Sequence, residues 1–111
     1  MNDYHEPTDQ LSEKDRDYVR CLNSLKEEIE AVDWYQQRIA ATKDEQLKAI
    51  LEHNRDEEIE HACMALEWLR RNMPGWDDEL RENLFKEGDI AHHDHDDDDD
   101  GDKDLGIGGM K

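Results

Sequence analysis

Apolar residues recur along two long stretches of this chain in alternating four- and three-residue steps. That spacing is typical of a helix that packs along a partner helix. The first series contains Tyr18, Leu22, Leu25, Ile29, Val32, Gln36 and Ile39, and the second contains Leu47, Leu51, Asn54, Glu58, His61, Ala65 and Trp68. We predict one helix from near Asp9 or Ser12 to about Ala41, and a second that ends at about Asn72, before Pro74-Gly75.

The segment between the two series, Thr42-Lys43-Asp44-Glu45, has the spacing of a helix capping box. It predicts a short turn and the start of the second helix. Because a short loop makes the helices it joins antiparallel neighbours, we expect an all-α, antiparallel two-helix hairpin. The spacing of Trp76, Leu80, Leu84 and Phe85 predicts a short third helix. We expect Asp77 or Asp78 to cap it, Gly88 to end it, and its apolar side to pack on a neighbour.

The amino-acid composition limits the size of the core that such a hairpin can form and the classes of partner that it can bind. Of 111 residues, 34% are hydrophobic and 41% are charged, and the formal net charge is −18. We therefore expect one small domain over residues 1–91, which gains a sufficient core by self-association. The negative charge disfavours nucleic acid and anionic membranes as partners. We find no apolar run that would span a membrane and no signal peptide, and Cys21 and Cys63 suit a reducing compartment.

The composition changes after Ile90. Residues 92–104 carry histidines and a run of aspartates, which predicts an acidic disordered linker that could also hold metal loosely. Residues 105–111 become apolar again, with Leu105 and Ile107 alternating with glycines. This pattern is typical of a short extended peptide that inserts two side chains into a groove of another protein.

The middle of the second series is polar. Glu58 and His61 form a Glu-x-x-His pair, which places both side chains on one helix face within reach of one cation. A carboxylate with an imidazole suits iron, manganese or zinc. A polar layer that fixes helix register is the alternative. On the first helix, Cys21, Glu28 and Tyr35 follow the edge of the series, so Glu28 can turn inward and Tyr35 could bind a ligand.

The ligand count favours two copies of the chain. Carboxylate-bridged di-metal centres in four-helix bundles use two Glu-x-x-His pairs and two further Glu residues. One chain offers half of this set, and a two-fold dimer offers all of it. We therefore expect Glu28, Glu58 and His61 from each copy to meet at an interface that also buries the apolar series.

Three blocks of sequence resemble the encapsulated ferritins. They are LKEEIEAVDWY at 25–35, ILEHNRDEEIEH at 50–61 and LGIG at 105–108, the last resembling a cargo-loading peptide that departs from the usual form at Gly109-Met110. The resemblance implies a chain that dimerises into a ferritin-like four-helix bundle and assembles further into a ring-shaped decamer. It implies a ferroxidase that oxidises Fe(II) to Fe(III) with oxygen, inside an encapsulin nanocompartment in the cytoplasm, where the iron is stored as mineral.

The same resemblance assigns roles to single residues. It makes Glu28, Glu58 and His61 the di-iron ligands, with Tyr35 close by. It places Glu27 and Glu30 at the site through which metal enters, where calcium or another divalent cation is a further candidate, and puts Trp34 near that route. Leu105 and Ile107 would bind the encapsulin shell. Three other functions remain open: a coiled-coil adaptor, a metal buffer, and a dimanganese protein that disproportionates peroxide.

Overall fold

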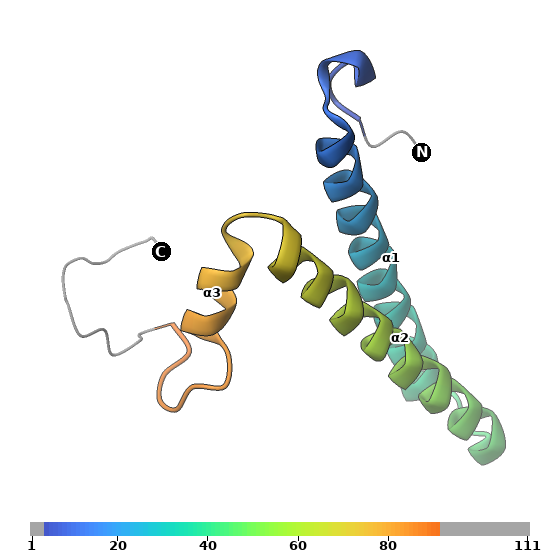
Figure 1. Cartoon of the computed structure of the whole chain (residues 1–111). Helices are drawn as coiled ribbons and strands as arrows, with labels where there is room; N and C mark the ends of the chain where they lie inside the picture. Colours follow the sequence, from blue (N-terminus) through green and yellow to red (C-terminus); the bar gives the residue numbers. More distant parts are fainter. Residues whose placement is uncertain (1–3, 92–111) are drawn as a thin grey trace. The chain divides into compact units, whose positions relative to one another are not determined.

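The protein is described by a computed structural model that covers residues 4–91. Its regular elements within this range are all helices: η1, a 3-10 helix at Thr8–Gln10, and the α-helices α1 (Glu13–Ala41), α2 (Glu45–Asn72) and α3 (Trp76–Asn83). The helices α1 and α2 pack on each other and are joined by a short turn (Figure 1). The predicted all-α class and the two long packed helices are confirmed.

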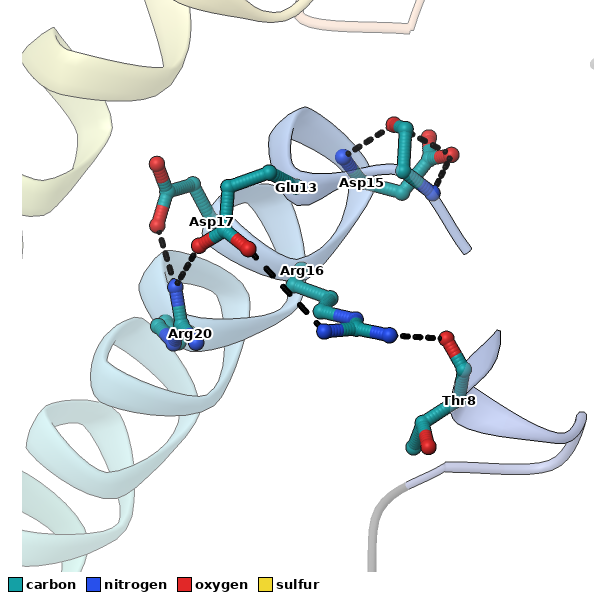
Figure 2. A network of polar contacts seen from close by, with 7 residues as sticks. Thr8, Glu13, Asp15, Arg16, Asp17 and Arg20 are labelled. Atoms are coloured by element: carbon teal, nitrogen blue, oxygen red, sulfur yellow. Dashed lines mark hydrogen bonds and ion pairs between the residues drawn. The ribbon is translucent and has the colours of Figure 1, made fainter. Parts of the chain in front are cut away.

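The start of α1 is fixed by a capping box at Ser12. The Asp15 backbone N–H donates to Ser12 Oγ at 2.9 Å, and the Ser12 backbone N–H donates to the Asp15 carboxylate at 3.1 Å. Figure 2 shows these bonds beside a network in which Arg16 donates to the Thr8 carbonyl and Arg20 contacts the Glu13 carboxylate at 3.0 Å. Residues 4–11 therefore contain the short helix η1 and are tied to α1 through the contact between Arg16 and Thr8.

The turn between α1 and α2 differs in detail from the prediction. The N-cap of α2 is Asp44, whose side chain accepts the Leu47 N–H at 2.9 Å, and not the predicted Thr42. The Thr42 hydroxyl instead accepts the Asp44 N–H at 3.2 Å. Thr42 is thus the C-cap residue of α1, in an extended conformation, and Asp44 is the separate N-cap residue of α2.

Four buried aliphatic side chains form the core between α1 and α2: Leu25, Ile39, Leu51 and Leu69. Leu69 is completely buried. The inward-facing positions of α1 also include the half-buried residues Cys21, Glu28, Val32 and Tyr35, and those of α2 include the half-buried residues Arg55, Glu58, Ala62 and Ala65. Both sets follow the predicted four- and three-residue steps, so the heptad spacing itself is correct.

The predicted series, however, lies partly on another face. Leu47, His61 and Trp68 of α2 are exposed, and so are Ile29 and Gln36 of α1. The face of α1 that contacts α2, and the face of α2 that contacts α1, are each rotated around the helix relative to the predicted series. The face of α1 passes through Cys21, Glu28 and Tyr35, which we predicted at the edge of the series.

The end of α2 is held by charged side chains. Arg70 contacts the Glu67 carboxylate at 2.8 Å and the Asp77 carboxylate at 2.6 Å. Hydrogen bonds from Arg70 and Arg71 hold the pKa of Glu67 at about 2. After α2 the chain turns through Gly75, whose φ of 102° favours glycine.

The helix α3 is shorter than predicted. It begins at Trp76, so neither Asp77 nor Asp78 is its cap, and it ends at Asn83 instead of continuing toward Gly88. Phe85 has a φ of 58°, in the left-handed region, which a right-handed helix cannot continue through. Phe85 is also fully exposed. The predicted packing of this helix on a neighbour stays a prediction.

The chain divides into two compact units, which meet between Asp77 and Asp78. The first contains α1, α2 and the first two residues of α3. The predicted linker at 92–104 and docking peptide at 105–111 lie outside the described residues. Within residues 4–91, no helix combines the length and the apolar character needed to cross a membrane.

Candidate metal centre

Glu28, Glu58 and His61 meet halfway along the α1/α2 pair. Each offers one ligand atom, and these atoms lie within 4.8 Å of one another. His61 Nδ1 is 3.5 Å from Glu28 Oε1 and 3.7 Å from Glu58 Oε1. Glu58 and His61 share a face of α2 because they are one turn apart, and the antiparallel register of α1 brings Glu28 opposite them.

The two carboxylates oppose each other electrostatically. A hydrogen bond with Glu58 raises the pKa of Glu28, and burial and the Glu58 charge raise it further, whereas His61 lowers it. One proton shared between two carboxyl groups is the usual response to two negative charges at close range. A divalent cation would replace that proton and neutralise both carboxylates.

The donor set fits a divalent transition metal. Two ligand atoms that bind one ion at about 2.1 Å are at most about 4.2 Å apart. The observed spread of 4.8 Å therefore requires only a small rotation of one side chain. Two carboxylate oxygens and one imidazole nitrogen suit iron, manganese or zinc better than a soft ion.

The centre is open on one side. The side chains of Glu28 and Glu58 are 26% and 25% exposed, but that of His61 is 48% exposed. Three ligands also leave a six-coordinate ion incomplete. The three side chains of one chain thus leave coordination positions open, and the imidazole lies at the solvent edge.

Exposed apolar side chains line the face of α2 that carries His61. Ile50, Met64 and Trp68 are 57%, 62% and 36% exposed, and Leu47 is 45% exposed. With Asn54, Glu57 and His61 they follow helical steps of three and four residues, so they form one stripe along the helix. We call this set the α2 stripe. Trp68 also contacts Tyr18 edge to face, with ring centroids 6.3 Å apart.

Tyr35 lies on the same seam as Glu28, two helical turns further along α1. Seven residues correspond to about 10.5 Å along a helix axis. Tyr35 is half-buried, and the Arg38 guanidinium lies over its ring at 5.2 Å from the centroid. Sequence reasoning missed Arg38, although its three-residue spacing from Tyr35 places the two on one face.

The other predicted residues stand apart from this cluster. Glu27 and Glu30 are exposed on α1, and Trp34 is 52% exposed. Among residues 4–91, the only group of three or more potential His, Cys, Asp or Glu ligands is Glu28, Glu58 and His61. Leu105 and Ile107 lie outside the described residues.

Comparisons with known proteins agree on one family. The sequence model of the EncFtn-like family matches residues 3–87. The chain is 68% identical over 88 residues to a protein from Thermotoga maritima named ferritin-like protein, an alignment that covers 79% of this chain and 77% of the relative. It is 54% identical over 90 residues to the encapsulated ferritin-like protein of Rhodospirillum rubrum, covering 81% of this chain and 64% of the relative.

Two further similarities extend the comparison. The encapsulin nanocompartment cargo protein EncC of Myxococcus xanthus is 41% identical over 61 residues, which cover 54% of this chain and 47% of that protein. The chain thus spans less than two thirds of the Rhodospirillum and Myxococcus relatives. The crystal structure of protein ne0167 from Nitrosomonas europaea has a TM-score of 0.78 and 57% sequence identity, covering 82% of this chain and all of the other.

Proposed function

The chain belongs to the EncFtn-like family, and we propose that it is a ferroxidase, which oxidises Fe(II) to Fe(III) at a di-iron site shared by two copies. The observation that carries the proposal is the cluster of Glu28, Glu58 and His61, with ligand atoms within 4.8 Å of one another and an imidazole facing outward. The ferritin-like names of the relatives support iron as the substrate.

A second copy related by a two-fold axis would complete the site. Such a contact brings the same surface of each chain together, so one copy adds its own Glu28, Glu58 and His61 to those of the other. The α2 stripe is the surface that must be buried for His61 to reach a shared ion. Its exposed apolar residues support this interface, because large apolar surfaces left in water are unfavourable. The product would be a ferritin-like four-helix bundle.

The side chains would divide the work as follows. Glu58 of each copy would be shared between the two Fe(II) ions, and Glu28 and His61 would supply the other protein ligands of each ion. Two adjacent Fe(II) ions would each give one electron to the same oxygen molecule. A single Fe(II) ion can supply only one of these two electrons.

Iron would reach the centre over the acidic surface. The net charge of −18 attracts cations. Glu27 and Glu30 are exposed carboxylates near the centre in sequence, and we propose that they hold Fe(II), calcium or another divalent cation briefly, with Trp34 beside the route. Tyr35 would lie close to the completed di-iron centre.

The encapsulin-related names of two relatives support a compartment. We propose that the dimers form a ring-shaped decamer inside an encapsulin shell in the cytoplasm, and that Leu105 and Ile107 dock the chain to that shell. Deleting residues 105–111 should leave Fe(II) oxidation unchanged and abolish co-purification with the shell protein. Normal co-purification of the truncated chain would refute the docking role.

Anaerobic loading with Fe(II), followed by air and measurement of the ferric absorbance rise, tests the activity. Glu58→Ala and His61→Ala should lose the rapid phase, whereas the matched variant Glu60→Ala, at an exposed residue of α2 outside the α2 stripe, should keep it. Oxidation at the native rate in either site variant would refute the proposal. Tight Fe(II) binding without oxidation would indicate a buffer, and absence of binding would indicate a structural module. Loading with Mn(II) and peroxide tests the dimanganese alternative.

A further inference from the structure

A hydrogen bond between α1 and α2 lies one turn of α2 from Glu58 and about 12 Å along α1 from Glu28. Arg55 Nη1 donates to Gln36 Oε1 at 2.9 Å. The other side of the same guanidinium contacts Asp56 Oδ1, from Nε at 3.1 Å and from Nη2 at 3.0 Å. The Arg55 side chain is 26% exposed, and its planar group is fixed between these two acceptors.

The apolar core is thin where this bond occurs. On α1 no residue between Leu25 and Ile39 is fully buried, and on α2 none is fully buried between Leu51 and Leu69. The metal cluster occupies this gap.

We propose that Arg55 and Gln36 form a clamp that holds α1 and α2 at the spacing the metal centre requires. Arg55 is three residues before Glu58, about 4.5 Å along the helix axis. The clamp therefore sets how far Glu58 and His61 lie from Glu28 on the facing helix. Arg55 and Gln36 are positioning residues that touch no metal, and their proposed role rests on the proposed function of the cluster.

The chemistry of the pair suits this task. The planar guanidinium of Arg55 offers several N–H donors in a fixed arrangement, so it can bond Gln36 and Asp56 at the same time. A Glu at position 36 would keep the acceptor, whereas a Lys at position 55 would lose the fork-shaped donor.

Co²⁺ titration of the full-length protein without iron or oxygen tests the clamp. Binding affinity and the visible absorption of the bound ion, which reports its coordination geometry, are both measured. Gln36→Ala and Arg55→Ala should each bind Co²⁺ about ten-fold more weakly, the lower end of the effect of residues that support metal ligands. The matched control is Gln37→Ala, because Gln37 bonds to Asp33 of its own helix at 3.0 Å and should bind as the native chain does.

Two further variants separate positioning from a general loss of structure. Gln36→Glu, unlike Gln36→Ala, keeps an oxygen that accepts from Arg55, so it should bind Co²⁺ with the native affinity and the native spectrum. The double variant Gln36→Ala/Arg55→Ala should bind no more weakly than Arg55→Ala alone, because the two residues act as one unit. Additive losses in the double variant would overturn the clamp.

The outcomes also separate the clamp from the metal centre itself. If Glu58→Ala abolishes Co²⁺ binding while Gln36→Ala binds at native affinity with a native spectrum, the clamp is wrong and the ferroxidase proposal stands. If Glu58→Ala leaves Co²⁺ binding unchanged, both proposals fail together.

Discussion

Replacing Glu58 with Gln should stabilise the metal-free chain while removing its response to metal. Glu28 and Glu58 place two carboxyl groups in hydrogen-bond contact, and this contact is the main cause of the raised pKa of Glu28. The arrangement suits a bound cation but is unfavourable without one. A Gln at position 58 removes one charge and offers an amide N–H that can donate to Glu28.

The size of the effect follows from the environment of the pair. Two unit charges at about 4 Å repel by about 4 kcal/mol in a medium of effective dielectric 20. That value is an upper limit, because both side chains are a quarter exposed and because Glu28 can take up a proton instead. The remaining gain is close to that of one hydrogen bond, so we expect the free energy of unfolding to rise by about 1 kcal/mol.

The pH dependence has a definite sign. Because the pKa of Glu28 is raised above its ordinary 4.5, the folded chain binds the proton more tightly than the unfolded chain does. The metal-free native protein is therefore favoured below pH 4.5 and loses this stabilisation as pH rises through the raised pKa. In Glu58→Gln this decline should be smaller, since the group that raises the pKa of Glu28 is gone.

Urea unfolding followed by circular dichroism, at one fixed chain concentration, measures both effects. In EDTA, Glu58→Gln should be more stable than the native chain, and Glu60→Gln should lie within about 0.5 kcal/mol of it. Glu60 is a fair control because it is exposed on α2 and lies outside both the α2 stripe and the face toward α1. With Co²⁺ at 100 times its dissociation constant, the native chain should gain about 2.7 kcal/mol and Glu58→Gln should gain none. A destabilised Glu58→Gln in EDTA, or equal stabilisation of both proteins by Co²⁺, would refute this reasoning.

Three other predictions concern stability. Leu69→Ala should lower the free energy of unfolding by about 3 kcal/mol, because Leu69 is completely buried, and a loss below about 1 kcal/mol in urea unfolding would contradict this. Ser12→Ala should cost about 1 kcal/mol through loss of the helix cap, visible as a lower thermal midpoint. Contacts with Arg70 and Arg71 hold the pKa of Glu67 at about 2, below its ordinary 4.5, so their stabilisation should be lost as pH falls from 4.5 toward 2. When the free energy of unfolding is measured against pH, Glu67→Gln should lack this loss of stability in acid. The loss is small in the native chain because the Glu67 side chain is 41% exposed.

The sequence predicted the helices well because their limits have local causes. Ser12 begins α1 through its own side chain, and Pro74-Gly75 follows the end of α2. The choice of Asp44 over Thr42 as a cap was harder, since both are good N-cap residues and the backbone of the turn decides between them. The end of α3 depends on the left-handed conformation of Phe85, for which a bulky aromatic residue gives no signal.

The packing of α1 on α2 was predicted less accurately, for a different reason. Heptad spacing shows that a helix has an apolar side, but α2 has two neighbouring apolar faces. One carries Leu51 and Leu69 against α1, and the other carries Ile50 and Trp68 in the α2 stripe. A single series drawn through the sequence took residues from both. Only the register between the helices separates them.

The metal cluster was predictable in part. The Glu58 and His61 pair follows from helical spacing alone, but the inward position of Glu28 depends on how α1 lies against α2. The bond between Arg55 and Gln36 was not predicted, because a half-buried arginine and an exposed glutamine resemble ordinary surface residues in the sequence. Long-range hydrogen bonds of this kind depend on three-dimensional placement and have no local pattern.

Under the proposed function, the two apolar faces of α2 would serve two separate contacts. The face toward α1 holds the hairpin together through a few buried aliphatic residues, which is little for a chain of this length. The α2 stripe supplies the remaining apolar surface, and His61 stands within it. Under the proposed two-fold arrangement, the contact that buries Ile50, Met64 and Trp68 is the same contact that brings in the second set of ligands. Metal binding and dimerisation would then stabilise each other, because each favours the one geometry in which the opposed carboxylates are neutralised.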